Sequence, residues 1–367
     1  MRRRASAARR RQGGAALLLA MLIVTLVASF SAAAAWRQWR AAEVEASERA
    51  RVQAGWLLLG ALDWSRLILR EDARADARNR AAADTLSEPW AVPLQEARLS
   101  TFLAADARQA AEIAALTGDD DANVFLSGEI VDAQSRLNVA NLAPLPAAAP
   151  PGSIAPDPAL QAFQKLFALL GLPADQVVVL RRNLRSAMAA TATATATAGA
   201  PPPAAGGVPV PAPAVVGPET PLMPQRAADL GWLGLPPATV AAIAPYVTVL
   251  PTPTPVNLNT ASPPVLAAVL PRLSLGAAQQ FAAGRALAPM RQPQDLAQRL
   301  GPETAIDPQL HGFGTAYFEV RGRLRLDRTV VEEQSLVRRN NNQTVVLWRQ
   351  RGGLALDPAQ AAALQQR

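Results

Sequence analysis

The chain has 367 residues, a formal net charge of +7, no cysteine and a single histidine, His311. This length exceeds that of one small domain, so we expect two folded units. The lack of cysteine excludes disulfides and thiolate chemistry. One histidine is too few for a Cys/His zinc site, and a lone histidine is more often structural than catalytic.

The positive charge is concentrated at the N-terminus. Residues 1–14 include six arginines and no acidic residue, and the rest of the chain has 30 basic against 29 acidic residues. An arginine-rich leader orients a membrane segment, because cytoplasmic flanks carry an excess of Lys and Arg. A nucleic-acid-binding protein would instead carry its basic surface on the folded part.

Residues 15–36 form an uncharged apolar run that we interpret as a transmembrane segment. At about 1.5 Å per residue a helix over this run spans roughly 33 Å, which is enough to cross the hydrocarbon layer of a bilayer. The arginines of the leader would hold the N-terminus in the cytoplasm, so the remainder of the chain faces the other side.

Two kinds of proteolytic processing fit this N-terminus. In a secretory signal peptide the cut follows the apolar run, here within 31–35, and leaves a soluble protein beginning near Trp36. In a prepilin-like protein the cut falls between Gly14 and Ala15, and the helix stays as anchor and assembly stem. The glycine at the junction and the basic residues before it favour the second kind.

The helical pattern continues beyond the membrane segment. Residues 37–80 contain no proline and are rich in Ala, Arg, Glu and Leu, which are good helix formers. We therefore expect one long helix, half in the membrane and half amphipathic. An ordinary anchor followed by a separate helix is the alternative. The prolines of 89–93 end the pattern.

The middle of the chain is predominantly helical after one predicted strand at 123–132. Asp119 to Asp121, just before this strand, form a polar turn whose spacing is not that of an EF-hand loop. Residues 156–184 predict two helices. Residues 189–224 are an Ala/Thr/Pro stretch predicted to be disordered. Short helices punctuated by prolines follow over 229–301.

The C-terminal part changes to the alternating pattern of β-strands. Apolar and charged residues alternate from Tyr317 to Leu326, and further strands are predicted at 329–337 and 344–348, joined by a turn at 338–342. Together with the strand near 124–132, these predict one sheet interrupted by a large helical insertion. The predicted fold class is therefore α+β.

Five segments, in this order along the chain, carry a family resemblance. They are the Arg-Gln-Gly-Gly leader end followed by its Leu-rich run, the Trp-containing turn 88–93, the strand and following element 128–138, the segment 245–261 and the closing strand 317–320. These segments resemble the K-type minor pseudopilin of the bacterial type II secretion system, also called general secretion pathway protein K. Each motif alone is weak, but their joint order is specific.

The resemblance implies a pilin-like fold, in which a long N-terminal helix packs on an antiparallel sheet that carries an all-α insertion. The implied division is a prepilin leader at 1–14, a transmembrane segment at 15–36, a periplasmic pseudopilin domain at 37–145 and 315–367, and a helical insertion at 146–314 that contains the disordered loop 189–224.

The resemblance also implies a role without catalysis. Prepilin peptidase would cut after Gly14, and Ala15 would be N-methylated. The chain would be a single-pass protein of the inner membrane with its C-terminal domain in the periplasm. It would join the I-type and J-type minor pseudopilins, the major pseudopilin and the inner-membrane secretion platform, and would cap or nucleate the pseudopilus tip for export of folded proteins.

Leu19 occupies a position that is usually acidic in pilin-like subunits. Pilin-like subunits usually have Glu at the fifth mature position, where a buried carboxylate pairs with the N-terminal amine of a neighbour, and the resemblance implies that the K type lacks this Glu. A subunit with nothing stacked above it has no such amine to pair, so an apolar residue there fits the tip. The simpler alternative is that Leu19 is one more lipid-facing residue.

Metal binding is not assigned from the sequence. Calcium is associated with this family, whose members often carry an acidic Trp-x-Asp segment late in the first helical unit. In this chain that region is Arg185-Ser186-Ala187-Met188, so the ligands are not identifiable. We predict no other cofactor.

A DNA-binding protein of DNA uptake is the rival hypothesis. Residues 256–285 also resemble helix-hairpin-helix domains, which grip phosphate with a Gly-x-Gly hairpin after Leu-Pro. Here Leu270-Pro271 is followed by Arg272-Leu273-Ser274, so both glycines are replaced, and the mature charge is near neutral. Nucleic-acid binding is therefore disfavoured.

An enzyme is disfavoured too. The sequence shows no Gly-rich phosphate loop, nucleophile elbow or metal-ligand cluster. Asn257 and Asn259 are interpreted as turn and helix-capping residues rather than catalytic groups.

Overall fold

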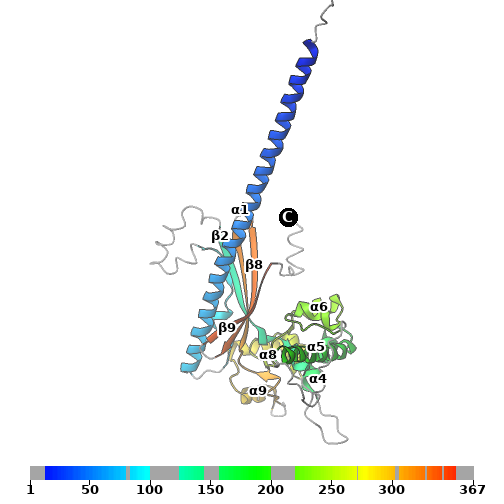
Figure 1. Ribbon diagram of the computed structural model, residues 1–367. Helices are drawn as coiled ribbons and strands as arrows, with labels where there is room; N and C mark the ends of the chain where they lie inside the picture. Colours follow the sequence, from blue (N-terminus) through cyan, green and yellow to red (C-terminus); the bar gives the residue numbers. More distant parts are fainter. Residues whose placement is uncertain are drawn as a thin grey trace, which may run out of the picture.

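The structure is a computed structural model. It describes residues 13–79, 83–99, 124–143, 157–199, 220–270, 272–301, 306–326, 329–340 and 343–352. These residues form a long helix, an antiparallel sheet and a helical region beside one end of that sheet (Figure 1).

The long helix, α1 (Gly13–Asn79), is unbroken over 67 residues. At about 1.5 Å per residue it is roughly 100 Å long. Its lower part lies along the sheet, and its upper part extends away from the rest of the protein (Figure 1). Residues 16–49 are exposed throughout. The prediction of one continuous helix is confirmed, and the alternative of two separate helices is wrong.

The sheet has the strand order β1-β2-β7-β8-β9, and all neighbours are antiparallel. The strands are β1 (Leu94–Arg98), β2 (Val124–Asp132), β7 (Tyr317–Leu326), β8 (Thr329–Asn340) and β9 (Gln343–Arg351). β2 pairs with β7 from Val124 opposite Leu326 to Asp132 opposite Phe318. The helical region is therefore inserted between two neighbouring strands, as the sequence predicted, and the α+β class is confirmed.

The helical region lies between β2 and β7 in sequence. Its helices are α4 (Pro158–Leu169), α5 (Asp175–Gly199), α6 (Pro237–Ile243), α7 (Pro263–Val269), α8 (Leu275–Leu287) and α9 (Pro293–Leu300), with the 3₁₀ helix η5 (Ala227–Leu233). Two parallel pairs of two-residue strands connect its segments: β3 (Leu137–Asn138) with β4 (Val247–Thr248), and β5 (Val256–Asn257) with β6 (His311–Gly312).

One apolar cluster holds the helical region together. Phe163, Phe167 and Leu266 are fully buried at its centre. Leu137 and Leu142, which precede the predicted boundary at 146, also belong to this cluster. The domain boundaries themselves stay predictions.

Two details differ from the sequence-based expectation. Helix α5 continues to Gly199, so the start of the predicted disordered loop at 189 is wrong. Alanine is the best helix former, and extending an existing helix avoids the unfavourable nucleation step. Strand β1 was not predicted, because Leu94-Gln-Glu-Ala-Arg lacks β-branched residues and a clear alternation. Residues 200–219 of the loop and the turn at 119–121 lie outside the described residues.

The lower half of α1 packs on the sheet through one apolar row. Leu58, Leu62 and Leu69 are almost completely buried, and their spacing places them on one helix face. They meet apolar side chains of the sheet, among them Leu126, Phe318, Val320, Leu324 and Val337. Burying each such side chain stabilises the folded state by about 1.5–3 kcal/mol.

Two glycines of α1 have different surroundings. Gly55 is buried beneath the guanidinium of Arg351, whose Nη2 donates to the Gly55 carbonyl oxygen at 3.0 Å. The Nε of Arg351 donates to the buried carboxylate of Glu333 at 2.7 Å. Gly60 is exposed and has no neighbouring atoms within 4 Å of the position a Cβ would take.

We expect Gly60→Ala to raise the free energy of unfolding by about 1 kcal/mol, because alanine is the better helix former. The free energy of unfolding of Gly55→Ala should lie at least about 1.5 kcal/mol below that of Gly60→Ala. The reason is that the new methyl group displaces a guanidinium that hydrogen-bonds a buried carboxylate. Denaturation of the detergent-solubilised full chain, followed by circular dichroism, measures both. Equal stabilisation by the two substitutions would contradict the contact between Gly55 and the guanidinium of Arg351.

Candidate assembly interface along the long helix

The upper half of α1 is an apolar helix without a partner in the described part of the chain. Its most apolar stretch has a mean hydropathy of 2.4, and none of that stretch is buried. A surface this apolar is not stable in water, whereas the length and composition suit a membrane span. The predicted transmembrane segment thus lies where the helix is bare.

The sequence-predicted processing residues lie at the start of this helix. Gly14 and Ala15 fall in the first turn of α1, and Leu19 follows one turn later with 59% of its surface exposed. No other part of the described chain packs on Leu19. Its assembly role, and the processing of Gly14 and Ala15, therefore remain predictions.

The lower half of α1 is fixed by a buried ion cluster around Arg339 of β8. Arg339 Nη1 donates to Asp72 of α1 at 2.7 Å, and Nη2 donates to Asp84 and to the carbonyl oxygen of Thr315. Its guanidinium lies 4.8 Å from the centroid of the Phe318 ring. All three charged side chains are at most 8% exposed, so the cluster connects helix, sheet and following loop by buried ion pairs.

This cluster contains more acidic than basic groups. Burial raises the pKa of Glu88 to about 7, against the hydrogen bond from Trp90 Nε1, and the charges of Asp72 and Asp84 raise it further. Burial together with Asp72 and Asp84 likewise raises the pKa of Asp76 to about 6. Burial disfavours the charge of Arg339, but the two carboxylates outweigh this effect and raise its pKa.

The same carboxylates have the spacing of a possible cation site. One oxygen of each of Asp72, Asp84 and Glu88 lies within 4.8 Å of the others. Arg339 already pairs with two of these groups, and the third accepts hydrogen bonds from Thr85 and Trp90. We therefore read the cluster as a structural clamp and assign no metal to it.

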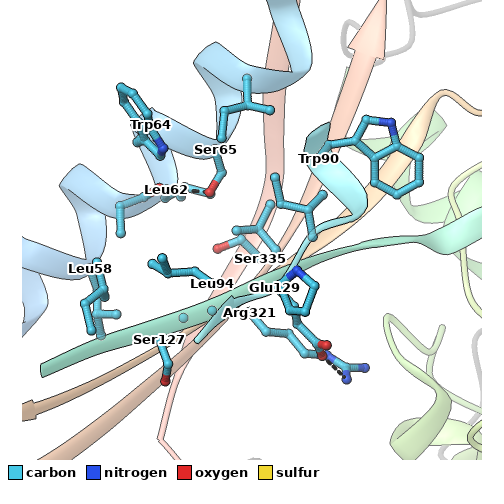
Figure 2. Close-up of a pocket in the computed structure, with 18 of the residues that line it drawn as sticks. Leu58, Leu62, Trp64, Ser65, Trp90, Leu94, Ser127, Glu129, Arg321 and Ser335 are labelled. Carbon is cyan, nitrogen blue, oxygen red and sulfur yellow. Dashed lines mark hydrogen bonds and ion pairs between the residues drawn. The ribbon is translucent and has the colours of Figure 1, made fainter. Parts of the chain in front are cut away.

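A cleft of about 270 Å³ runs along the flank of α1, between the helix and the β1–β2 side of the sheet. Leu58 and Leu62 of α1 line it together with Leu94 of β1, and Trp64 is half exposed on the helix beside it (Figure 2). Trp90, from the 3₁₀ helix η1 (Pro89–Ala91), lines the far side and packs edge-to-face on Phe318. Because an apolar cavity of about 150 Å³ can hold benzene, this cleft has room for one large apolar side chain from outside.

A hydrogen-bond network that the sequence analysis did not identify joins the sheet to the helical region. Asp132, at the end of β2, accepts hydrogen bonds from Thr260 at 2.5 Å and from Asn257 at 2.9 Å. Burial raises the pKa of Asp132 to about 6, although these hydrogen bonds oppose the shift. Asn257 Oδ1 accepts from the backbone N–H of Asn259 at 3.0 Å, so its predicted turn role is confirmed. In the sequence, this network was indicated only by the Asp and Asn residues that recur in segments at the ends of strands.

His311 has a structural position. Its Nδ1 accepts from the backbone N–H of Asp307 at 3.1 Å, and its Nε2 lies 2.9 Å from the carbonyl oxygen of Val269. Both ring nitrogens are occupied by backbone groups, and burial lowers the pKa of the ring, so it is neutral at pH 7. This agrees with the expectation that a lone histidine is structural.

Two residues that flank the turn between α7 and α8 contact the rest of the helical region. Lys165 of α4 donates from Nζ to the carbonyl oxygens of Leu270 and Leu273, at 2.9 and 3.2 Å. The side chain of Leu273 is buried in the apolar cluster. Leu270 and Leu273 thus belong to the core of the helical region.

Comparison with known proteins agrees with these features. Two family models, both described as type II secretion system protein K, match residues 135–252 and 256–313. The chain belongs to the protein K family of the type II secretion system. As a member of this family it is a minor pseudopilin, and none of the comparisons supports the DNA-uptake alternative.

The fold of this pseudopilin is also found in a solved structure. The crystal structure of the GspK-GspI-GspJ complex from the enterotoxigenic Escherichia coli type 2 secretion system contains a chain that matches with a TM-score of 0.50 and 18% identity. The match covers 84% of this chain and 98% of that chain. A search of the curated proteins gave no match.

We expect Arg339→Leu to destabilise the protein by about 3–5 kcal/mol, because it leaves Asp72 and Asp84 buried without their cation. Arg323→Leu is the matched control. Arg323 lies one strand away, is 48% exposed and pairs with Glu332 at 3.5 Å, so its loss should change stability by at most about 1 kcal/mol. Denaturant unfolding measures the stability of both variants. Similar losses of stability would contradict the role of the Arg339 cluster as a structural clamp.

The raised pKa of Glu88 gives a second expectation with a definite sign. Between the ordinary pKa of 4.5 and about 7 the folded state binds more protons than the unfolded state, so stability falls as the pH rises through this window. We expect Glu88→Gln to remove this part of the pH dependence, as seen in unfolding curves from pH 4.5 to 8.

Asp295→Asn is the control for this experiment. Hydrogen bonds from the Arg291 and Gln292 backbone lower the pKa of Asp295, so it titrates below this window and its loss should leave the slope unchanged. Parallel curves for wild type and Glu88→Gln would show that Glu88 does not titrate in this range.

Proposed function

We propose that this pseudopilin is a non-enzymatic, single-pass subunit of the inner membrane that caps or nucleates the tip of the periplasmic pseudopilus. The observation that carries the proposal is the division of α1. Its lower half is fixed to the sheet, whereas residues 16–49 are exposed throughout, and their most apolar stretch suits both a membrane span and the core of a helical fibre. Catalysis plays no part in this role.

Two further features support a tip position. Leu19 replaces the acidic residue that pairs with a neighbour's N-terminal amine, so nothing needs to stack above this subunit. The helical region lies at the end of the molecule opposite the bare half of α1 (Figure 1). A bulky region at that end fits the outer end of a fibre better than a repeating shaft.

The partners follow from the same proposal. The solved relative was crystallised with GspI and GspJ. We propose I-type and J-type minor pseudopilins as direct partners of this chain, with the major pseudopilin, prepilin peptidase and the inner-membrane platform as further contacts. The bare half of α1 and the cleft on its flank are the surfaces available to a neighbouring helix.

We expect the mature protein to begin at Ala15, with an N-methyl group and only when prepilin peptidase is present. Gly14→Asp should block the cut, whereas Gly13→Ala should leave it unchanged. Mass spectrometry of the membrane-extracted protein measures the first residue. A start near Trp36 would show signal-peptidase processing and refute the pseudopilin anchor.

We expect this subunit at one end of each fibre only. Gold-labelled antibody against the helical region, applied to isolated pseudopili, should mark one end of each fibre. Labelling along the shaft would contradict the tip position, and antibody against the major pseudopilin serves as the positive control for shaft access.

A further inference from the structure

Two tryptophans and two arginines directly follow the apolar run of α1. Trp36 and Trp39 are 60% and 59% exposed, and their ring centroids lie 5.3 Å apart with an interplanar angle of 39°. Arg37 and Arg40 lie between and just after them, and both are exposed. We refer to Trp36–Arg40 as the aromatic–arginine collar.

The arginines of the collar differ from those further along the same helix. Arg49 pairs with Glu45 at 2.8 Å, and Arg51 pairs with Glu48 at 3.4 Å. Within the described part of the chain Arg37 and Arg40 form no ion pair with an acidic side chain. Their guanidinium groups can therefore reach an anion outside the protein.

The chemistry of the collar matches the headgroup layer of a bilayer. Tryptophan is enriched at membrane–water interfaces, where its ring lies against the hydrocarbon and its N–H reaches polar groups. The planar guanidinium of arginine forms bidentate hydrogen bonds with phosphate. The collar begins at the end of a run that spans roughly 33 Å, which is where the headgroups of the far leaflet lie.

We propose that the Trp36–Arg40 collar binds phospholipid headgroups on the periplasmic surface of the membrane and sets the depth of α1. This inference rests on the proposed single-pass anchor. The next fully buried residue is Ala54, so about 20 Å of bare helix separates the headgroups from the folded part. Once the leader is removed, the collar carries the nearest side-chain charges to the span and resists movement of the helix in either direction.

A neighbouring pilin helix is the other occupant that could cover the two indoles. The lipid is favoured because the collar adjoins the apolar span and because its arginines, which have no acidic partner in the described part of the chain, are suited to phosphate. A helix that packs on the two rings would shield them from lipid, so lipid contact distinguishes the two occupants.

Fluorescence quenching in nanodiscs tests the tryptophans. The full chain is placed in bilayers of phosphatidylcholine brominated either near the headgroup end or near the methyl end of the acyl chain. We expect stronger quenching by the shallow bromines. Trp36→Phe with Trp39→Phe should abolish most of it, whereas Trp56→Phe with Trp64→Phe, two exposed tryptophans of the stem, should preserve it. Shallow quenching that survives in the first variant, or vanishes in the second, overturns the proposal.

Native mass spectrometry tests the arginines. The full chain, extracted from vesicles of phosphatidylcholine and phosphatidylglycerol, should retain bound phosphatidylglycerol. Arg37→Gln with Arg40→Gln should reduce its apparent affinity by about fivefold for each arginine removed. Arg49→Gln with Arg51→Gln should change it by less than twofold, because these side chains are already paired. Equal losses in both variants refute a collar-specific site.

These experiments fail separately from the proposed function. Neither uses prepilin peptidase or another pseudopilin. A protein that begins at Ala15 but shows no collar-dependent quenching would refute the collar and leave the pseudopilin role intact. A protein that begins near Trp36 would refute both.

Discussion

The packing of the lower half of α1 on β7 and β8 is the constraint on which the rest of the structure depends. An isolated helix of this length has no fixed direction relative to a folded domain. The apolar row from Leu58 to Leu69 and the Arg339 cluster fix its lower half at several points. Because α1 is unbroken, fixing one half also sets the direction of the membrane half, and the exposed surface of the upper half is left for lipid or other subunits.

The second constraint is the pairing of β2 with β7. It joins segments on either side of the helical region, so that region stands at one end of the sheet rather than on α1. Asp132 fixes this junction through Thr260 and Asn257. Several segments that carry the family resemblance thus connect separate parts of the fold. Trp90 packs on Phe318 of β7, and the 256–261 segment hydrogen-bonds to the end of β2.

The sequence was informative where one physical pattern dominates. The absence of proline over 37–80 predicted the continuous helix, and alternation over 317–326 predicted β7. Interactions between distant residues were not predictable, because nothing local marks Arg339 as the partner of Asp72 and Asp84. Local composition misled at 189–199, where repeated threonine suggested disorder but α5 simply continues. The roles of Gly14, Ala15 and Leu19 still rest on sequence alone.

Photo-crosslinking from single cysteines most directly tests the central claim that the bare half of α1 is the assembly surface. The chain has no native cysteine, so benzophenone maleimide can be attached at one chosen position. Ala46→Cys places the probe on the exposed half of α1, and Leu287→Cys places it on the helical region, at a side chain that is 91% exposed. Crosslinks to another pseudopilin from Ala46→Cys but not from Leu287→Cys are the predicted result. Their absence from a correctly processed Ala46→Cys protein in assembled pseudopili would contradict the account.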